Sequence, residues 1–259
     1  MLRRFVPGTI DYNGLMAANY QQGRALSPQA AEAWRAALAP FVPQGKDLTI
    51  LDLGAGTGRF AGFLSQVFAG RVIGVEPAFG MRSNASPAAL PNDLTFIGGS
   101  AEQIPLRDAS CDVAWLSQVL HHVRDRTRCA GELRRVLRGD GHVFIRGALA
   151  DSRHLFPTTL RFFPGIAPIF DDLPSIAETV STFQSQGFML EAHRRVEQQI
   201  SASLREFADR TRLRADTSLA LLSDEDFEAG MAALDAAAAH ETALAPIFET
   251  LELLVFRTD

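Results

Sequence analysis

The sequence is poor in cysteine, with Cys111 and Cys129 as the only two such residues among 259. Two thiols supply too few ligands for a tetrahedral zinc site, and these two are too far apart in the chain for a Cys-x-x-Cys redox pair. We therefore expect two reduced thiols and no metal site.

The sequence also lacks long apolar runs and clusters of positive charge. No stretch of about 18 uncharged apolar residues occurs, and the basic residues of MLRRFVPGTIDY are not followed by an apolar segment. The chain has 30 acidic and 25 basic side chains, a formal charge of −5, and no Lys/Arg run of the kind that neutralises a phosphate backbone. We expect a cytoplasmic protein that binds neither a membrane nor nucleic acid.

Apolar residues make up 47% of the chain, enough for one large α/β domain with elaborations. Between about residues 46 and 150, short apolar runs alternate with segments of helical period; these runs are LTILDL, RVIGVE, LTFI, CDVAWLS and HVFIR. Such alternation is typical of parallel strands covered by helices on both faces. We predict a Rossmann-like, doubly wound α/β sheet, mostly parallel, over residues 46–150.

Two further regions are predicted to flank this core. Residues 1–45 form an N-terminal helical cap, in which Ser27 is the N-cap of a helix that starts at Pro28. Residues 151–259 begin with a long aromatic loop that has no clear period, followed by a helix whose capping box is Ser175 and Glu178. That helix ends near Gly187.

The last part of the chain is predicted to complete the sheet. A strand runs from Phe188 to about Ile200, and a helical cap insertion occupies residues 203–244. The final LELLVFR is a C-terminal antiparallel strand.

A glycine-rich turn is the clearest functional signal. Gly54, Gly56 and Gly58 lie where the first strand turns into a helix, and ligands of open α/β sheets bind at that edge. The dinucleotide fingerprint G-x-G-x-x-G fails here, because Arg59 occupies the place of the third glycine. Asp52 is poorly suited to a pyrophosphate but suits a cofactor that bears an ammonium and a sulfonium. The turn favours such a cofactor over a nicotinamide.

A second carboxylate strengthens this interpretation. Glu76 ends the next strand, where an acidic residue of nucleotide-binding α/β folds accepts hydrogen bonds from ribose hydroxyls. Asp52 and Glu76 together indicate an adenosine ligand that carries positive charge.

Four ordered segments, LDLGAGTG, GVEP, GGSAEQIPL and CDVAWLSQVLHHVRD, resemble motifs of the class I S-adenosylmethionine-dependent methyltransferases. The resemblance covers about Tyr20 to Gly147 and implies that S-adenosylmethionine is the cofactor. We expect the cofactor site to comprise Tyr20, Arg24, Asp52, Gly54, Ala55, Gly56, Gly58, Glu76, Pro77, Ser100, Ala101, Glu102 and Ser117.

The resemblance also implies roles within this set. The backbone of Gly54 and Gly56 contacts the methionine part, and Glu76 binds the ribose. Ala101 and Glu102 lie beside the adenine, and Ser117 lies by the amino acid part. The upstream YQQGR resembles a Tyr-x3-Arg element, which places Arg24 near the cofactor carboxylate with Tyr20 closing over it. At Ser100 the sequence departs from many relatives, which have Asp there to hold the adenine amino group.

His121 and His122 follow the fourth predicted strand, beside the expected position of the reactive methyl. Imidazole has a pKa suited to removing a proton at neutral pH, so these two are the candidate catalytic residues, with His121 first. The opposing interpretation is that the pair packs or bonds the next loop, and many methyl transfers need no protein base.

Four aromatic residues of the predicted loop are candidates for the acceptor pocket: Phe156, Phe162, Phe163 and Phe170. They either line an apolar pocket and stack on a cation, or pack onto the core. We expect the acceptor to be small, partly apolar, and uncharged or cationic.

The sequence therefore predicts a methyltransferase acting on a small, partly apolar metabolite. One alternative is an enzyme that consumes the cofactor without methylation, by intramolecular cyclisation releasing 5′-methylthioadenosine, as azetidine-2-carboxylate synthases do, or another repurposed methyltransferase fold. A third is a non-catalytic adenosine-nucleotide-binding module. The acceptor atom and the oligomeric state are left open.

Overall fold

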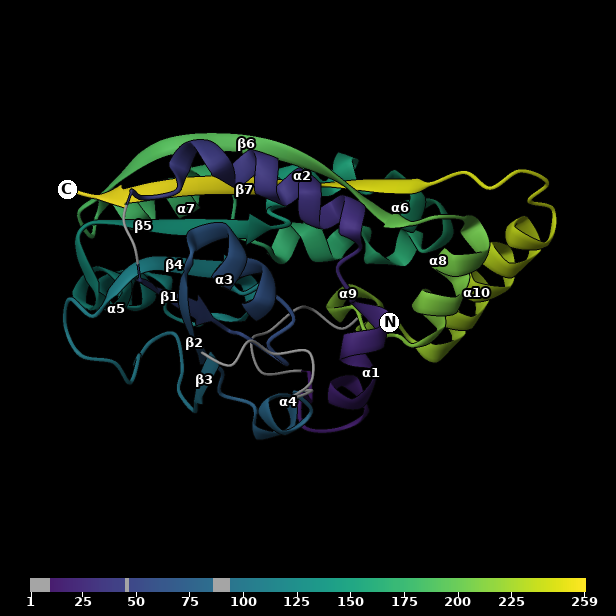
Figure 1. The fold of residues 1–259 in the computed structure, drawn as a ribbon. Helices are drawn as coiled ribbons and strands as arrows, with labels where there is room; N and C mark the ends of the chain where they lie inside the picture. Colours follow the sequence, from purple (N-terminus) through teal and green to yellow (C-terminus); the bar gives the residue numbers. More distant parts are fainter. Residues whose placement is uncertain (1–9, 45–46, 86–93) are drawn as a thin grey trace.

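The computed structural model describes residues 10–44, 47–85 and 94–259. Its centre is a seven-stranded sheet with the strand order β3-β2-β1-β4-β5-β7-β6 (Figure 1). The strands are β1 (Leu48–Leu53), β2 (Gly70–Val75), β3 (Leu94–Ile97), β4 (Cys111–Ser117), β5 (Leu137–Gly147), β6 (Phe188–Ser201) and β7 (Ile247–Thr258). β1 to β5 pair in parallel, and β7 is antiparallel to both neighbours. The predicted Rossmann-like sheet with a C-terminal antiparallel strand is confirmed.

Alternation along the strands supplies two hydrophobic layers, one on each face of the sheet. Ile50 of β1 belongs to the cluster that contains Trp34 of α2 (Pro28–Leu38) and residues of α3 (Ala61–Phe68). The next residue, Leu51, belongs to the cluster that contains Leu133 of α5 (Arg126–Val136) and Phe183 of α7 (Ile176–Gln184). All five of these cluster residues are buried.

Two helix starts follow the predicted capping chemistry. The Ser27 hydroxyl accepts a hydrogen bond from the Ala30 N–H at 3.1 Å, and Pro28 opens α2. At α7, Ser175 and Glu178 form the reciprocal capping box, with bonds of 3.1 and 2.8 Å.

The segment predicted as an irregular aromatic loop is helical. It contains η4 (Ala150–Leu155), α6 (Pro157–Phe162) and η5 (Pro164–Asp172). The prolines open α6 and η5, where a missing N–H costs nothing, and the pieces are too short to show a helical period. Four other short elements were not predicted: α1 (Leu15–Gly23), η1 (Ala39–Phe41), α4 (Phe79–Ser83) and η3 (Leu120–His122).

The region predicted as a helical insertion consists of α8 (Leu204–Arg212), α9 (Thr217–Ala220) and α10 (Asp224–Ala239). Figure 1 shows α1, α8, α9 and α10 gathered beyond the end of the sheet to which the β5 arrow points. β7 then begins at Ile247, several residues earlier than predicted. In the described part of the chain, no helix has the length and apolar character needed to cross a bilayer.

Candidate active site

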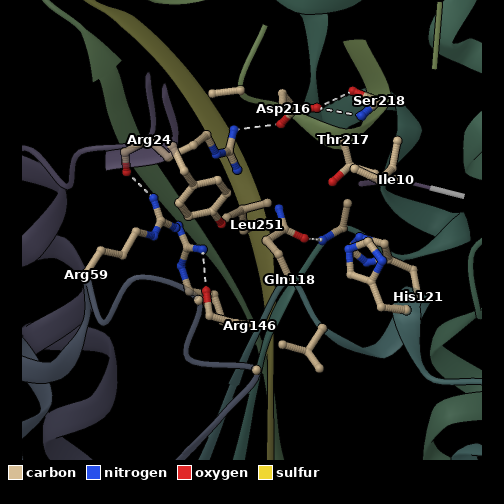
Figure 2. A pocket seen from close by; sticks show the side chains of 18 of the residues that line it. Ile10, Arg24, Arg59, Gln118, His121, Arg146, Asp216, Thr217, Ser218 and Leu251 are labelled. Atoms are coloured by element: carbon tan, nitrogen blue, oxygen red, sulfur yellow. Dashed lines mark hydrogen bonds and ion pairs between the residues drawn. The ribbon is translucent and has the colours of Figure 1, made fainter. Parts of the chain in front are cut away.

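A cavity of about 820 Å³ lies at the carboxyl ends of the parallel strands (Figure 2). Its wall comes from the turn after β1, the ends of β2 and β4, and the segment after β3. The other side of the wall comes from β5, β6 and β7, from α1 and η5, and from the segment that joins α8 to α9. Parts of the chain far apart in sequence therefore enclose one space.

The glycine-rich turn forms one end of this cavity. Gly54, Gly56 and Gly58 have φ angles of 72°, 58° and 75°, which non-glycine residues adopt only with strain. Gly54 and Gly56 line the cavity. A Cβ on Gly54 would lie 2.5 Å from the Val119 side chain, so only glycine lets β1 and the segment after β4 approach this closely.

Glu76 holds the glycine turn against the end of β2. One carboxylate oxygen accepts a hydrogen bond from the Gly56 N–H at 3.0 Å, and the other accepts one from the Ala78 N–H at 2.8 Å. Burial raises the pKa of Glu76, and these two bonds oppose the rise. Each oxygen keeps a further lone pair, and the side chain lines the cavity. The carboxylate can therefore accept bonds from a vicinal diol such as that of ribose.

Asp52 takes a different position from the one expected. It does not line the cavity, and only 3% of its surface is exposed. Strand alternation explains this, because Asp52 lies two residues after Ile50 and so faces the layer of α2 and α3. Burial raises its pKa to about 7, with Arg59 opposing the shift. The expectation that Asp52 faces the cofactor's positive charge is corrected accordingly.

Of the remaining residues in the predicted cofactor set, some line the cavity and others do not. Ala55 and Gly58 do not line the cavity, because Ala55 packs toward β2 and Gly58 donates its N–H back to the Ala55 carbonyl at 2.9 Å. The cavity is lined by Pro77, Ser100, Ala101, Glu102 and Ser117.

Tyr20 and Arg24 line the cavity from α1 and its end. Arg24 forms an ion pair with Asp216 at 2.6 Å, and the Asp216 carboxylate also accepts the Ser218 N–H at 2.8 Å as the N-cap of α9. Arg59 donates to the backbone carbonyl of Arg24 and lies 5.9 Å from the centre of the Tyr20 ring. The two cap segments are therefore joined to each other and to the glycine turn.

His121 and His122 both line the cavity just beyond β4. His122 Nε2 lies 3.0 Å from the Tyr12 hydroxyl, which in turn lies 2.7 Å from the Thr217 hydroxyl. Burial lowers the pKa of His122 to about 4. Burial, followed by His122 and nearby arginines, lowers the pKa of His121 well below its ordinary value. A lowered pKa favours the neutral imidazole at both positions.

The four aromatic candidates separate into two pairs. Phe156 and Phe170 line the cavity, with ring centres 5.3 Å apart. Phe162 and Phe163 do not line it; Phe163 is 1% exposed and stacks on Phe227 of α10 at 5.8 Å. All four rings belong to one hydrophobic core cluster, and only Phe156 and Phe170 also line the cavity, so the acceptor-pocket prediction is corrected for Phe162 and Phe163.

Several lining residues were missed by the sequence analysis. Arg146 is the last residue but one of β5, and one Nη donates to the Ser117 hydroxyl at 2.9 Å and the other to the Gln198 side-chain oxygen at 2.8 Å. Glu249 of β7 bonds Thr159, and burial raises its pKa to about 7. No motif marks these positions, since each reads as part of an ordinary strand.

The part of the chain that forms the glycine turn, Glu76 and the end of β4 has a match among known families. Residues 51–145 match the family described as a methyltransferase domain. Residues 51–145 are thus a methyltransferase domain, as the resemblance of the sequence motifs predicts.

Relatives of this chain match over part of their length. An uncharacterized methyltransferase of Mycobacterium bovis is 34% identical over 140 residues, which are 54% of this chain and 53% of that protein. The chain thus spans about half the length of the curated relatives it matches.

Two solved structures share the fold. A protein of Anabaena variabilis from an antibiotic biosynthesis pathway, assigned as a methyltransferase, has a TM-score of 0.65 at 20% identity, covering 87% of this chain and 96% of that one. The [4+2]-cyclase SpnF has a TM-score of 0.59 at 20% identity, covering 91% and 84%.

The methyltransferase-domain match ends at residue 145. Arg146, Gln198 and Glu249 therefore lie outside it, as do α8, α9, α10 and η5. The family match therefore covers the glycine-turn side of the cavity and does not extend to the other side.

Proposed function

We propose that this protein transfers the methyl group of S-adenosylmethionine to a small, partly apolar metabolite. The observation that carries the proposal is the division of one cavity into two halves. The glycine turn and Glu76 form a half suited to an adenosine, and Phe156 and Phe170 form an apolar half beside it. The methyltransferase-domain match of residues 51–145 supports the choice of cofactor.

The residues at the first half fit this cofactor. Glu76 has lone pairs for both ribose hydroxyls, and Gly56 brings bare backbone to the cavity beside it. Pro77, Ala101 and Glu102 would flank the adenine, with Ser100 in place of the aspartate of many relatives. Tyr20 and Arg24 would cover the amino acid part from α1. When bound, the cofactor supplies an electrophilic methyl on a sulfonium.

The chain's own contribution is to orient the acceptor and exclude water. Holding the reacting atoms in line is worth about 7 to 11 kcal/mol relative to free collision. Phe156 and Phe170 present apolar surface to the acceptor and keep water from the methyl. His121, with its neutral imidazole, is proposed to take the acceptor's proton where the acceptor has one to lose.

The proposal keeps two expectations from the sequence. The protein acts in the cytoplasm, and its partner is a small molecule, with no role for nucleic acid or membrane.

A second candidate function is intramolecular cyclisation of S-adenosylmethionine. It is favoured by two aromatic rings on the cavity wall, which can hold a sulfonium by cation–π contact. Asp52 does not line the cavity, so it makes no direct contact there with the protonated ammonium that would resist cyclisation. The SpnF structure shows that this fold also occurs in a cyclase.

The products formed from S-adenosylmethionine separate these functions. We expect S-adenosylmethionine to stay intact with protein alone and to give S-adenosylhomocysteine only when an extract of small metabolites is added, as measured by mass spectrometry. Enzyme-dependent 5′-methylthioadenosine from the cofactor alone would promote the cyclase. Binding without turnover in any extract would favour the non-catalytic module. S-adenosylhomocysteine at a hundred times its Kd should stabilise the fold by about 2.7 kcal/mol, and NAD should not.

A further inference from the structure

The buried side chain of Arg146 has a positive charge that the protein does not match. Arg146 is 2% exposed and lines the cavity, in which Figure 2 shows it beside Arg59 and across from His121. Its two hydrogen bonds go to neutral oxygens, those of Ser117 and Gln198. A guanidinium has five N–H donors, and Nε has no acceptor among the described residues. A buried cation in this state is costly unless an anion joins it.

The neighbouring charges do not supply that anion. Burial lowers the pKa of Arg146, and the charges of Arg59 and Arg24, which repel it, lower that pKa further, while Tyr20 opposes the shift. Arg24 is already paired with Asp216 at 2.6 Å, and Asp52 acts on Arg59. Within the described residues, the carboxylates of this region therefore serve the other arginines. The rings of Trp34 and Phe60, at 4.7 and 5.1 Å, hold the guanidinium in place without neutralising it.

Binding of the cofactor does not neutralise the excess positive charge around Arg146. S-adenosylmethionine carries an ammonium, a sulfonium and one carboxylate, so its binding adds net positive charge to the same cavity. Its proposed contacts run along the ends of β3, β2, β1 and β4, from Glu102 to Ser117. Arg146 lies one strand further, on β5, next to the β7 and β6 side that the cofactor does not need. Because the cofactor's single carboxylate is assigned to Arg24, the anion that matches Arg146 is expected on the acceptor.

We propose that the methyl acceptor carries an anionic oxygen group, a carboxylate or a phosphate, that binds Arg146, and that its apolar body lies against Phe156 and Phe170. This inference rests on the proposed function and names the substrate class of that site. It replaces the expectation of an uncharged or cationic acceptor. Because Arg146 also holds Ser117 at the end of β4, an acid bound to it lies beside the expected place of the methyl.

The test uses simple aromatic probes on protein saturated with S-adenosylhomocysteine. Benzoate and phenyl phosphate carry the anion, and benzamide and benzylamine are the neutral and cationic counterparts. We expect at least one anionic probe to bind at least about 10-fold tighter than benzamide in isothermal titration, the size of a hydrogen bond to a charged group. The tighter of the two identifies the group as a carboxylate or a phosphate. Equal affinity for all four probes would overturn the inference.

Two variants locate the effect at Arg146. Arg146→Met removes the charge at similar volume, and should lower the affinity for the anionic probe about 10- to 100-fold without a lower unfolding midpoint. Arg146→Lys keeps the positive charge but lacks the planar, two-pronged set of N–H donors of a guanidinium, so it should retain a weaker preference for the anionic probe. Arg161→Met, which removes an exposed arginine outside the cavity, should leave probe binding unchanged. If Arg146→Met keeps full affinity for the anionic probe, the inference is wrong.

A further measurement excludes the cofactor's carboxylate as the partner of Arg146. Arg146→Met should bind S-adenosylhomocysteine and its decarboxylated analogue in the same affinity ratio as the unsubstituted protein does. A loss confined to the carboxylated ligand would assign Arg146 to the cofactor and overturn the inference, while the methyltransferase proposal would stand. Absence of S-adenosylhomocysteine binding to the unsubstituted protein would instead overturn the proposed function.

Discussion

Replacing Glu76 by glutamine tests the part of the cavity assigned to the ribose. The carboxylate has about four lone-pair positions, and two are taken by the N–H groups of Gly56 and Ala78 at 3.0 and 2.8 Å. Two are left for the ribose hydroxyls. A charged hydrogen bond contributes about 1.5 to 3 kcal/mol, so Glu76→Gln should weaken S-adenosylhomocysteine binding about 10- to 150-fold.

The amide of Glu76→Gln also has an effect without ligand. Its NH2 group faces a backbone N–H, so one of the two backbone bonds is lost and the unfolding midpoint should fall. Titration calorimetry at pH 8 measures the ligand effect while the wild-type carboxylate, whose pKa burial raises, is ionised. Glu132→Gln is the matched control, because Glu132 accepts the Ile104 N–H at 2.8 Å outside this cavity. The control should lower the midpoint and leave ligand affinity unchanged. Wild-type affinity in Glu76→Gln would refute the ribose assignment.

Two other predictions concern the core and the proton acceptor. Phe163→Ala should lower the free energy of unfolding by about 3 to 5 kcal/mol in denaturant titrations while S-adenosylhomocysteine affinity is retained, because Phe163 packs in the core; a large loss of affinity in a folded variant would contradict this. If His121 is the base, kcat/KM should keep its value on acidification to below pH 6.5, because a base whose pKa is lowered stays deprotonated, and His121→Ala should reduce kcat about 100-fold or more. An acidic limb near pH 7 that is abolished by Glu249→Gln would assign proton removal to Glu249 instead, whose pKa burial raises to about 7.

Local chemistry explains which parts of the fold could be predicted from the sequence. The Ser27 and Ser175 caps act within one helical turn, and the apolar runs of β1 to β5 carry their own strand signal. The helices α1 and α6 were missed because they are short and depend on burial against distant parts of the chain.

In the candidate site, too, the residues marked by local sequence patterns could be predicted and those that depend on distant contacts could not. The glycine turn and Glu76 were found because their spacing is local, and both line the cavity. Asp52 was misplaced because its role was argued from distance to the glycines, although alternation from Ile50 already turns it to the other face. Asp216 could not be found, since its ion pair with Arg24 joins residues that lie 192 positions apart.

The cavity wall is built from two separable parts of the chain. Residues 51–145 supply the glycine turn, Glu76 and Ser117, whereas Arg146, Phe170 and Glu249 come from outside that family match. Substitutions in the second group leave the backbone around the glycine turn untouched. If the proposed function holds, acceptor choice can therefore diverge among descendants of this chain while selection on the proposed cofactor half is maintained. In directed evolution, libraries limited to β5, β7 and η5 should yield variants that accept new substrates. A smaller fraction of their members should be unfolded than in libraries that also vary the glycine turn.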